Sequence, residues 1–367
     1  MTAAPIHATR RAVLAGAAAT LTAAPLRAGA TPAPATAEPV ATVPAMLSAA
    51  GRTGHVVITE FRLTHLGVTW SGLRTGGQVR FRAPSGWTQW RRIEGELGSG
   101  SSRVAVLTAP AGSTAYEIEP HPDALTRVHE LNATDGPRRR VRAAATASGL
   151  DALTGIPVRG GYRSRAAWGA DESLRFGRDG AETFPQAFYE VQTLTVHHTV
   201  TANGDPDPAA TMRAIYFVHT VTQNFGDIGY HLLIDERGVV YEGRVSGDDP
   251  LPVFGGQAGT RRMSNGAHTG GFNAGNVGVA LLADLTGTLP TGLALDALVR
   301  VLATLCRITG LDPLGTTQYV NPISGATATV PTIAGHRQWL ATECPGNAFF
   351  PALPAVRTRV ARALSAH

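Results

Sequence analysis

Apolar and polar residues alternate in short runs over about residues 54–135, where Gly, Ser and Pro separate one run from the next. Such alternation is typical of strands that bury one face, because successive side chains of a strand point to opposite sides. The clearest runs are His55–Leu63, Val79–Ala83, Val104–Thr108 and Ala115–Glu119. The pattern predicts a small β-rich, sandwich-like domain over residues 51–136.

Three tryptophans, Trp70, Trp87 and Trp90, lie within this β-rich segment. Buried tryptophans would fill the core of a small domain, whereas exposed ones could stack on sugar rings. We favour the core, because large aromatic side chains dominate the packing energy of a small domain.

From about residue 160 the pattern changes to strands that alternate with helices. The predicted strands are Val191–Val200, the hairpin Tyr230–Asp235 with Gly238–Tyr241, and the apolar central strand Asn276–Leu282. The predicted helices are Pro208–Phe225, Leu293–Thr309 with Gly310 at its end, and Phe349–Ala366, interrupted near Pro354. Residues 160–367 are therefore predicted to form an α/β domain with a mixed central β-sheet flanked by helices.

The first thirty residues have the features of an export signal. Thr9–Leu14 contains two adjacent arginines followed by apolar residues, an alanine-rich run reaches Leu26, and Ala28–Ala30 suits a cleavage site. An ordinary secretory signal is the alternative, but the paired arginines favour the twin-arginine route. We therefore expect a secreted, cell-wall associated protein with a signal over residues 1–30, a flexible leader over 31–50 and a linker over 137–159.

Composition and charge exclude several functional classes. The chain contains no lysine, and all 32 basic residues are arginines, so mechanisms that need a lysine acid or a Schiff base are excluded. Removal of residues 1–30 takes away three arginines and no acid, which lowers the formal net charge from +5 to about +2. This mild charge is no nucleic-acid signature, and no later stretch approaches the ~20 apolar residues of a transmembrane segment.

Two adjacent histidines on the predicted strand at Val191–Val200 are candidates for chemistry. Only one can face an open site, because neighbouring side chains on a strand point to opposite faces. His197 shares its face with polar threonines, whereas His198 lies on a mostly apolar face. We therefore expect His197 to serve the site and His198 to be packed. Together with His336 and Cys344 it would make a zinc set of three ligands, which leaves a fourth position open for hydrolysis.

Five motifs occur in a fixed order over about residues 160–367. They are RAAWGA at Arg165–Ala170, the HHT strand, DIGYHLLID at Asp227–Asp235 with VYEGR at Val240–Arg244, AHTGGFNAGNVGV at Ala267–Val279, and the closing GHR to CPG segment. In these motifs the chain resembles the zinc N-acetylmuramoyl-L-alanine amidases of the second type, a family that includes the peptidoglycan recognition proteins.

This resemblance implies roles for individual residues. It implies that His197, His336 and Cys344 bind Zn²⁺, that Tyr230 is the catalytic tyrosine, and that Thr342 assists by hydrogen bonding. The segment with His268, Thr269 and Asn273 resembles the part of the family that lines the muropeptide groove, and His219 lies on a helix that the family often uses there. From the sequence alone, a structural role is the safer interpretation of His219. Asp227 and Glu242 belong to motifs that recur for structural reasons, and we leave them out of the catalytic set.

The expected function is zinc-dependent cleavage of the amide bond between N-acetylmuramic acid and L-alanine of peptidoglycan. A non-catalytic peptidoglycan-binding protein with a vestigial zinc site is the main alternative. We favour the enzyme because family members that only bind usually lack the cysteine ligand, and Cys344 is present. A zinc peptidase is a third hypothesis, and a Cys306–Cys344 disulfide would abolish the metal site. Peptidoglycan is the expected partner, and a monomer is the expected state.

Overall fold

The computed structural model describes residues 40–72, 75–98, 101–142, 161–247, 252–256 and 261–366. The predicted export signal and residues 143–159 of the predicted linker lie outside the described residues. Within the described ranges, no helix has both the length and the apolar character that crossing a membrane requires.

The N-terminal region is rich in β-structure, as the alternating pattern predicts. Its strands form one eight-stranded sheet in the order β2-β9-β3-β8-β4-β5, with β6 paired to β4 and β7 paired to β8. The strands are β2 Leu47–Ala50, β3 Val56–Ser71, β4 Gly77–Ala83, β5 Gly86–Trp87, β6 Arg91–Arg92, β7 Glu96–Leu97, β8 Ser102–Pro120 and β9 Thr126–Asn132. We call this region the accessory domain. The long strands β3 and β8 shift register near Leu63, an irregularity that bends strands.

The three tryptophans of the accessory domain lie in different environments. Trp70 is 1% exposed and belongs to the core of the sheet, as predicted. Trp87 is 36% exposed, so the core prediction is wrong for this residue. The guanidinium of Arg80 lies 4.7 Å from the ring centroids of both Trp87 and Trp90, so a cation contacts both rings.

Two predictions made from composition are wrong where the structure describes the chain. Residues 40–50 of the expected flexible leader form β1, Val40–Pro44, and β2. Residues 138–142 of the expected linker form β10, Arg138–Arg142, which pairs antiparallel with β1. The two strands are almost a hundred residues apart in the chain, so no local sequence pattern predicts that they pair. Arg139 also donates a hydrogen bond to the carbonyl of Gly169 at 2.7 Å.

The C-terminal domain is built on a six-stranded mixed sheet in the order β11-β15-β14-β18-β13-β21. The strands are β11 Tyr162–Arg163, β13 Thr193–His198, β14 Leu232–Ile234, β15 Val240–Glu242, β18 Asn276–Leu281 and β21 Ile333–Gly335. The hairpin β14–β15 is antiparallel, and the remaining pairs are parallel. Every residue of the central strands β13 and β18 is buried, as expected for parallel strands in a sheet covered on both faces.

Smaller elements surround this sheet. The strands β12 Phe188–Glu190, β16 Phe254–Gly255 and β17 Arg262–Ser264 form a three-stranded sheet, and β19 Thr316–Val320 pairs with β20 Thr327–Pro331. The short helices are α2 Arg165–Trp168, η1 Glu172–Arg175, η3 His336–Gln338 and η4 Phe350–Ala352.

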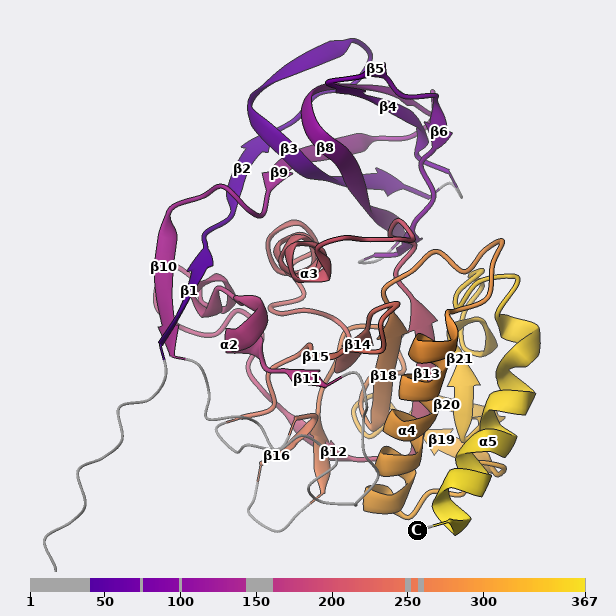
Figure 1. Ribbon diagram of the computed structural model, residues 1–367. Coiled ribbons are helices and arrows are strands. Elements are labelled where there is room, and N and C mark those ends of the chain that lie inside the picture. Colours follow the sequence, from indigo (N-terminus) through magenta and orange to yellow (C-terminus); the bar gives the residue numbers. More distant parts are fainter. Residues whose placement is uncertain are drawn as a thin grey trace, which may run out of the picture. The chain divides into compact units, whose positions relative to one another are not determined.

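Helices lie on both faces of the six-stranded sheet (Figure 1). One face packs against α4, Gly292–Thr309, and α5, Leu353–Ser365. The other packs against α3, Pro208–Phe217, which continues as the π-helix η2, Val218–Thr222. The α/β prediction is confirmed, and Gly310 ends α4 in the left-handed conformation. The predicted interruption near Pro354 is confirmed, because the segment divides into η4 and α5, and α5 begins at Leu353 with Pro354 in its first turn, where its missing N–H costs nothing.

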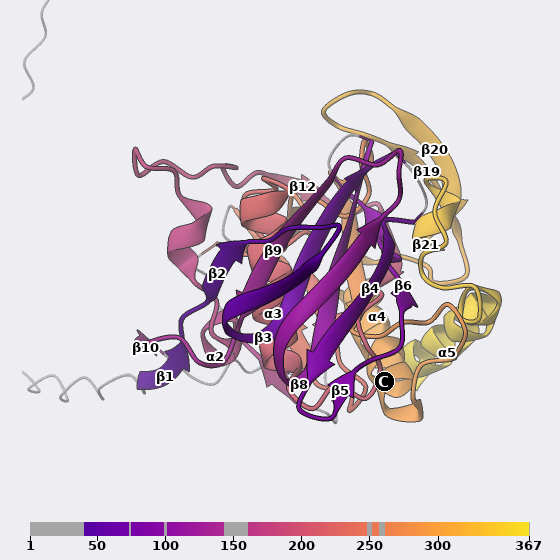
Figure 2. The same cartoon turned by 90° about the horizontal axis from the view of Figure 1, so that it is seen from above.

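The accessory domain packs directly on α3. Val106 of β8 and Leu131 of β9 belong to the same buried cluster as Ile215 of α3. His65 Nε2 lies 3.0 Å from Thr211 Oγ1, and Arg213 donates two hydrogen bonds to the carbonyl of Ala133. Figure 2 shows the long strands of the accessory sheet crossing over this helix. A shared core therefore holds the accessory domain against the C-terminal domain.

Candidate metal centre and active site

Three of the residues expected to bind metal come together at one edge of the six-stranded sheet. His197 is near the end of β13, His336 directly follows β21, and Cys344 lies on the loop after η3. The strands β13 and β21 are parallel neighbours, so their carboxyl ends meet at the same edge. One donor atom from each residue lies within 4.8 Å of the other two, and His197 Nδ1 is 3.6 Å from Cys344 Sγ.

This cluster fits a zinc ion. A tetrahedral site with Zn–S of about 2.3 Å and Zn–N of about 2.05 Å has an N···S edge of about 3.6 Å, close to the distance found. His336 is 3% exposed, and neither of its ring nitrogens has a hydrogen-bond partner among the described residues. A buried imidazole without partners is costly, and a metal ion would satisfy it. Burial also lowers the pKa of His336 to about 3 and that of His197 well below its usual value, which keeps both rings in the neutral form that binds metal.

A chain of hydrogen bonds orients His197. Its Nε2 lies 3.0 Å from Nδ1 of His268, whose Nε2 lies 2.9 Å from the carbonyl of Asn276. The carbonyl can only accept, so the proton of His268 belongs on Nε2, and its Nδ1 accepts from His197. The lone pair of His197 Nδ1 then points toward Cys344, as metal binding requires. Gly278 makes room for this arrangement, since a Cβ there would lie 2.6 Å from the ring of His268.

The second histidine of the strand serves a different purpose. His198 Nδ1 accepts a hydrogen bond from the backbone N–H of Leu285 at 3.1 Å. Its own backbone N–H points to Cys344 Sγ at 3.4 Å. The ring of His198 therefore holds the loop after β18, and its backbone N–H positions the sulfur of Cys344.

The loop that carries Cys344 is held from within. The backbone N–H of Cys344 donates to Thr342 Oγ1 at 3.2 Å, and the N–H of Arg337 donates to the carbonyl of Cys344 at 2.9 Å. Gly335 allows close packing before His336, because a Cβ there would lie 2.9 Å from a methyl group of Leu353. The alternative disulfide is not formed, since Cys306 is a free thiol buried in the core with α4.

Tyr230 lies beside the predicted ligands, and its hydroxyl forms a hydrogen bond with another residue. Its ring centroid is 5.1 Å from that of His197, and its side chain is buried. The hydroxyl donates a hydrogen bond to the carboxylate of Glu96, which comes from β7 of the accessory domain. Burial raises the pKa of Glu96 to about 8, and the contact with the Cys344 thiol opposes this shift. The sequence around Glu96 contains no motif, so sequence reasoning missed this residue.

The residues expected in the substrate groove lie around this centre. His219 is buried on η2 with its ring 5.6 Å from that of Tyr230, and its Nδ1 accepts the N–H of Gly229 at 3.0 Å. Asn273 Oδ1 accepts the backbone N–H groups of His268 and Thr269, at 2.8 and 2.7 Å, and so holds their loop behind His197. His268 and Thr269 are buried in this structure. Their contact with substrate stays a prediction.

A cavity of about 190 Å³ opens beside Cys344, and both domains line it. From the C-terminal domain the lining includes His198, Thr286, Thr342 and Cys344. From the accessory domain it includes Thr75, Arg92, Glu96 and Arg103. The candidate site is therefore a composite of the two domains, which sequence reasoning on the C-terminal motifs did not predict.

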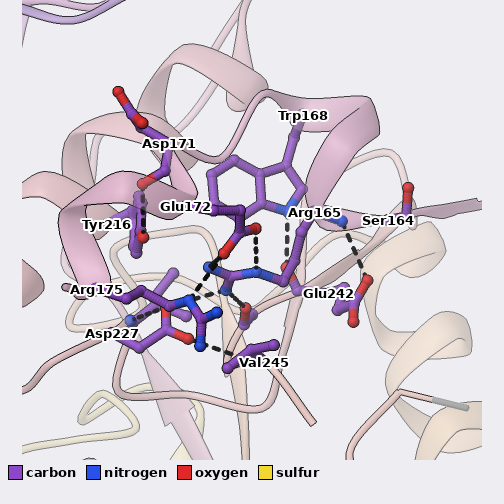
Figure 3. A network of polar contacts seen from close by, with 12 residues as sticks. Ser164, Arg165, Trp168, Asp171, Glu172, Arg175, Tyr216, Asp227, Glu242 and Val245 are labelled. Carbon is purple, nitrogen blue, oxygen red and sulfur yellow. Dashed lines mark hydrogen bonds and ion pairs between the residues drawn. The ribbon is translucent and has the colours of Figure 1, made fainter. Parts of the chain in front are cut away.

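Asp227 and Glu242, which we left out of the catalytic set, belong to a buried ion-pair network (Figure 3). Arg165 pairs with Asp227 at 3.0 Å and with Glu172 at 2.8 Å, and Glu242 accepts the backbone N–H of Arg165. Asp227 also accepts the N–H of Val245 at 2.9 Å. The network joins the RAAWGA motif to the DIGYHLLID and VYEGR motifs, so these acids have a structural role.

Comparison with known proteins identifies the family of this chain. Residues 187–347 match the family described as N-acetylmuramoyl-L-alanine amidase. A peptidoglycan recognition protein of Trichoplusia ni is 30% identical over 162 residues, which cover 44% of this chain and 71% of that protein. The chain belongs to this family of amidases and peptidoglycan recognition proteins.

Other family members match over part of their length. The N-acetylmuramoyl-L-alanine amidase of Homo sapiens is 32% identical over 241 residues, which cover 62% of this chain and 34% of that protein. The amidase of Mus musculus is 27% identical, and 46% of its length is covered, so the chain spans less than half of these two relatives. The solved structure of Drosophila PGRP-LB is 25% identical, covers 53% of this chain and 92% of that one, and has a TM-score of 0.38.

Proposed function

We propose that this family member is a zinc hydrolase that cleaves the amide bond between N-acetylmuramic acid and L-alanine of peptidoglycan. The observation that carries the proposal is the buried set His197, His336 and Cys344, which supplies three donor atoms within 4.8 Å and leaves a fourth position for chemistry. Relatives named as amidases support the reaction class. The family match supports peptidoglycan as the substrate.

Zinc held by these three residues would polarise the amide carbonyl and lower the pKa of water toward neutrality. The hydroxyl of Tyr230, once released from Glu96, would donate a hydrogen bond to the oxyanion that develops on the carbonyl. Thr342 has a hydroxyl on the cavity wall and would orient groups without carrying charge. His268 fixes the tautomer of His197 and acts as a positioning residue.

The proposal extends to the place where the enzyme works. Peptidoglycan lies outside the cytoplasm, and the paired arginines at Arg10 and Arg11 support export of the folded chain. We therefore propose a secreted, wall-associated enzyme that reaches its polymer as a monomer.

Mass spectrometry of digested peptidoglycan tests the reaction. Purified peptidoglycan is incubated with the zinc-loaded protein without residues 1–30, and with its His336→Ala variant. We expect intact glycan strands and stem peptides with a free L-alanine amine, produced by the unchanged protein alone. Stem peptides that remain on muramic acid despite a loaded metal would contradict the amidase function, and cleavage inside the peptide would identify a peptidase.

A non-catalytic binding protein is the second candidate, because the family includes recognition proteins. Cys344→Ser separates the two functions. An amidase loses zinc and hydrolysis together in this variant. A binding protein sediments with insoluble peptidoglycan equally well before and after the substitution, and releases no peptide in either form.

A further inference from the structure

Glu96 brings a carboxylate from the accessory domain into the candidate zinc site. The strand β7 pairs with β8, which places Glu96 opposite Val104 and points its side chain toward Cys344. Its Oε2 accepts the hydrogen bond from Tyr230, and its Oε1 lies 3.9 Å from Cys344 Sγ. The residue is 9% exposed. A single acid therefore contacts both the predicted catalytic tyrosine and a predicted metal ligand.

The position of this carboxylate suits a fourth zinc ligand. Carboxylate oxygens bind zinc at about 2.0–2.2 Å, so a tetrahedral site has an O···S edge of about 3.6 Å. The distance of 3.9 Å between Glu96 Oε1 and Cys344 Sγ is a few tenths of an ångström longer. Glu96 is not among the three residues whose donor atoms lie within 4.8 Å of one another, so its side chain would have to move toward His197 and His336 to complete the coordination.

Glu96 also lacks a cationic partner among the described residues. Asp227, another buried acid, pairs with Arg165 at 3.0 Å. Among the described residues, no arginine or histidine forms an ion pair with Glu96, whose contacts are a phenol and a thiol. The ionised form of a buried carboxyl is costly without a counter-ion, and a zinc ion between His197, His336 and Cys344 would supply the charge that stabilises it.

The accessory domain also restricts access for substrate. The cavity beside Cys344 holds about 190 Å³, whereas small-molecule sites usually measure about 300–1,000 Å³. A muropeptide with its sugar and stem is at least of drug size, so it does not fit this cavity, and His197 and His336 are buried. The contact of the accessory sheet with α3 holds β7 in this place.

Resting on the proposed amidase function, we propose that Glu96 is a fourth zinc ligand, supplied by the accessory domain, and that it closes the position needed by water and the scissile carbonyl. The enzyme is latent in this conformation. Cleavage requires β7 to withdraw, which frees the hydroxyl of Tyr230 and lets water take the place that the carboxylate leaves. Muropeptide and Glu96 therefore compete for one site.

Glu96→Gln tests this role, because the amide keeps the size of the side chain and is a poor zinc ligand. Glu60→Gln is the matched control, an exposed acid on β3 of the same sheet. Each protein is loaded with cobalt(II), whose visible absorption reports the ligand set, and zinc retention is measured against a chelator. We expect Glu96→Gln to change the cobalt spectrum, to weaken zinc binding at least tenfold, as loss of even a supporting partner does, and to raise peptidoglycan hydrolysis. Glu60→Gln should have the same cobalt spectrum, zinc affinity and hydrolysis as the unchanged protein.

Two results would overturn the proposal. An unchanged cobalt spectrum and zinc affinity in Glu96→Gln would show that the carboxylate does not bind the metal. Hydrolysis that falls in Glu96→Gln would show that the residue assists catalysis instead of blocking it. Glu96→Asp keeps the charge and shortens the side chain, so it carries the same spectral test if thermal melting shows that the glutamine variant is unfolded.

The experiments can reject the proposed amidase function and the proposed role of Glu96 independently of each other. If no variant releases peptide from peptidoglycan, the proposed reaction is wrong. The cobalt spectrum and the zinc affinity then still decide whether Glu96 binds the metal, because neither depends on turnover.

Discussion

Replacement of His268 by phenylalanine should weaken zinc binding about 10- to 100-fold, although it removes none of the three predicted ligands. The ring of His268 accepts a hydrogen bond from His197 Nε2 at 3.0 Å, deep in the protein. Phenylalanine keeps an aromatic ring in this place but has no acceptor. The substitution therefore tests whether the tautomer of His197 is fixed by its neighbour.

The magnitude follows from the hydrogen bond. In the metal-free variant, His197 can move its proton to Nδ1, which faces Cys344 Sγ at 3.6 Å. Zinc binding forces the proton back to Nε2, where the phenylalanine offers no acceptor. A buried donor without a partner costs about 1–3 kcal/mol, which corresponds to about 5- to 140-fold in affinity at about 1.4 kcal/mol per factor of ten. The penalty falls on the metal-bound state alone.

Competition with a chromophoric chelator measures the zinc affinity, and His55→Asn, an exposed histidine of the accessory domain, is the control. His268→Asn should recover part of the loss, since its amide oxygen can stand near the place of Nδ1. An affinity of His268→Phe equal to that of the unchanged protein would refute the reasoning, and so would a loss of the same size in His55→Asn.

Three more outcomes are expected. Tyr230→Phe should lower kcat for muropeptide about 10²- to 10³-fold with zinc content unchanged, as measured by steady-state kinetics and metal analysis, because it removes one donor to the oxyanion. Arg165→Met should lower the free energy of unfolding in urea by about 3–5 kcal/mol, because it leaves buried Asp227 without its cation. Arg359 forms an exposed ion pair with Asp296, so Arg359→Met should lower the free energy of unfolding by only about 0–1 kcal/mol. Equal losses in Arg165→Met and Arg359→Met would contradict the argument. Burial lowers the pKa of His65 from 6.5 to about 3, so the unfolded chain takes up its proton first and stability is lost as pH falls below 6.5. Urea titrations of zinc-stripped protein should show that His65→Asn removes about 1.4 kcal/mol per pH unit of this dependence, and an unchanged slope would count against it.

Much of the fold could be predicted from local sequence patterns. The alternation of side chains on β13 separates His197 from His198, and the structure gives the two rings different partners. The ends of α4 follow from Thr291, whose hydroxyl caps the first turn, and from Gly310, which adopts the left-handed conformation. These features depend on neighbours a few residues apart, so the sequence shows them directly.

Other features escaped sequence reasoning because they depend on pairing over long distances. The strand β1 looks like a flexible Pro-, Ala- and Thr-rich leader until its partner β10 is known. Composition describes the average behaviour of such segments, whereas hydrogen bonds and contacts with distant residues decide their structure.

The sequence by itself determined the α/β class of the C-terminal domain and its central strands, and it proposed the three residues that the structure brings together as a candidate metal site. Only the tertiary structure placed Glu96 beside Cys344, although the two are 248 residues apart in the chain. A sequence motif consists of residues that one domain needs for its own fold and chemistry. A contact between two domains depends on how their surfaces pack, here through the shared core of β8, β9 and α3, and no local pattern encodes it.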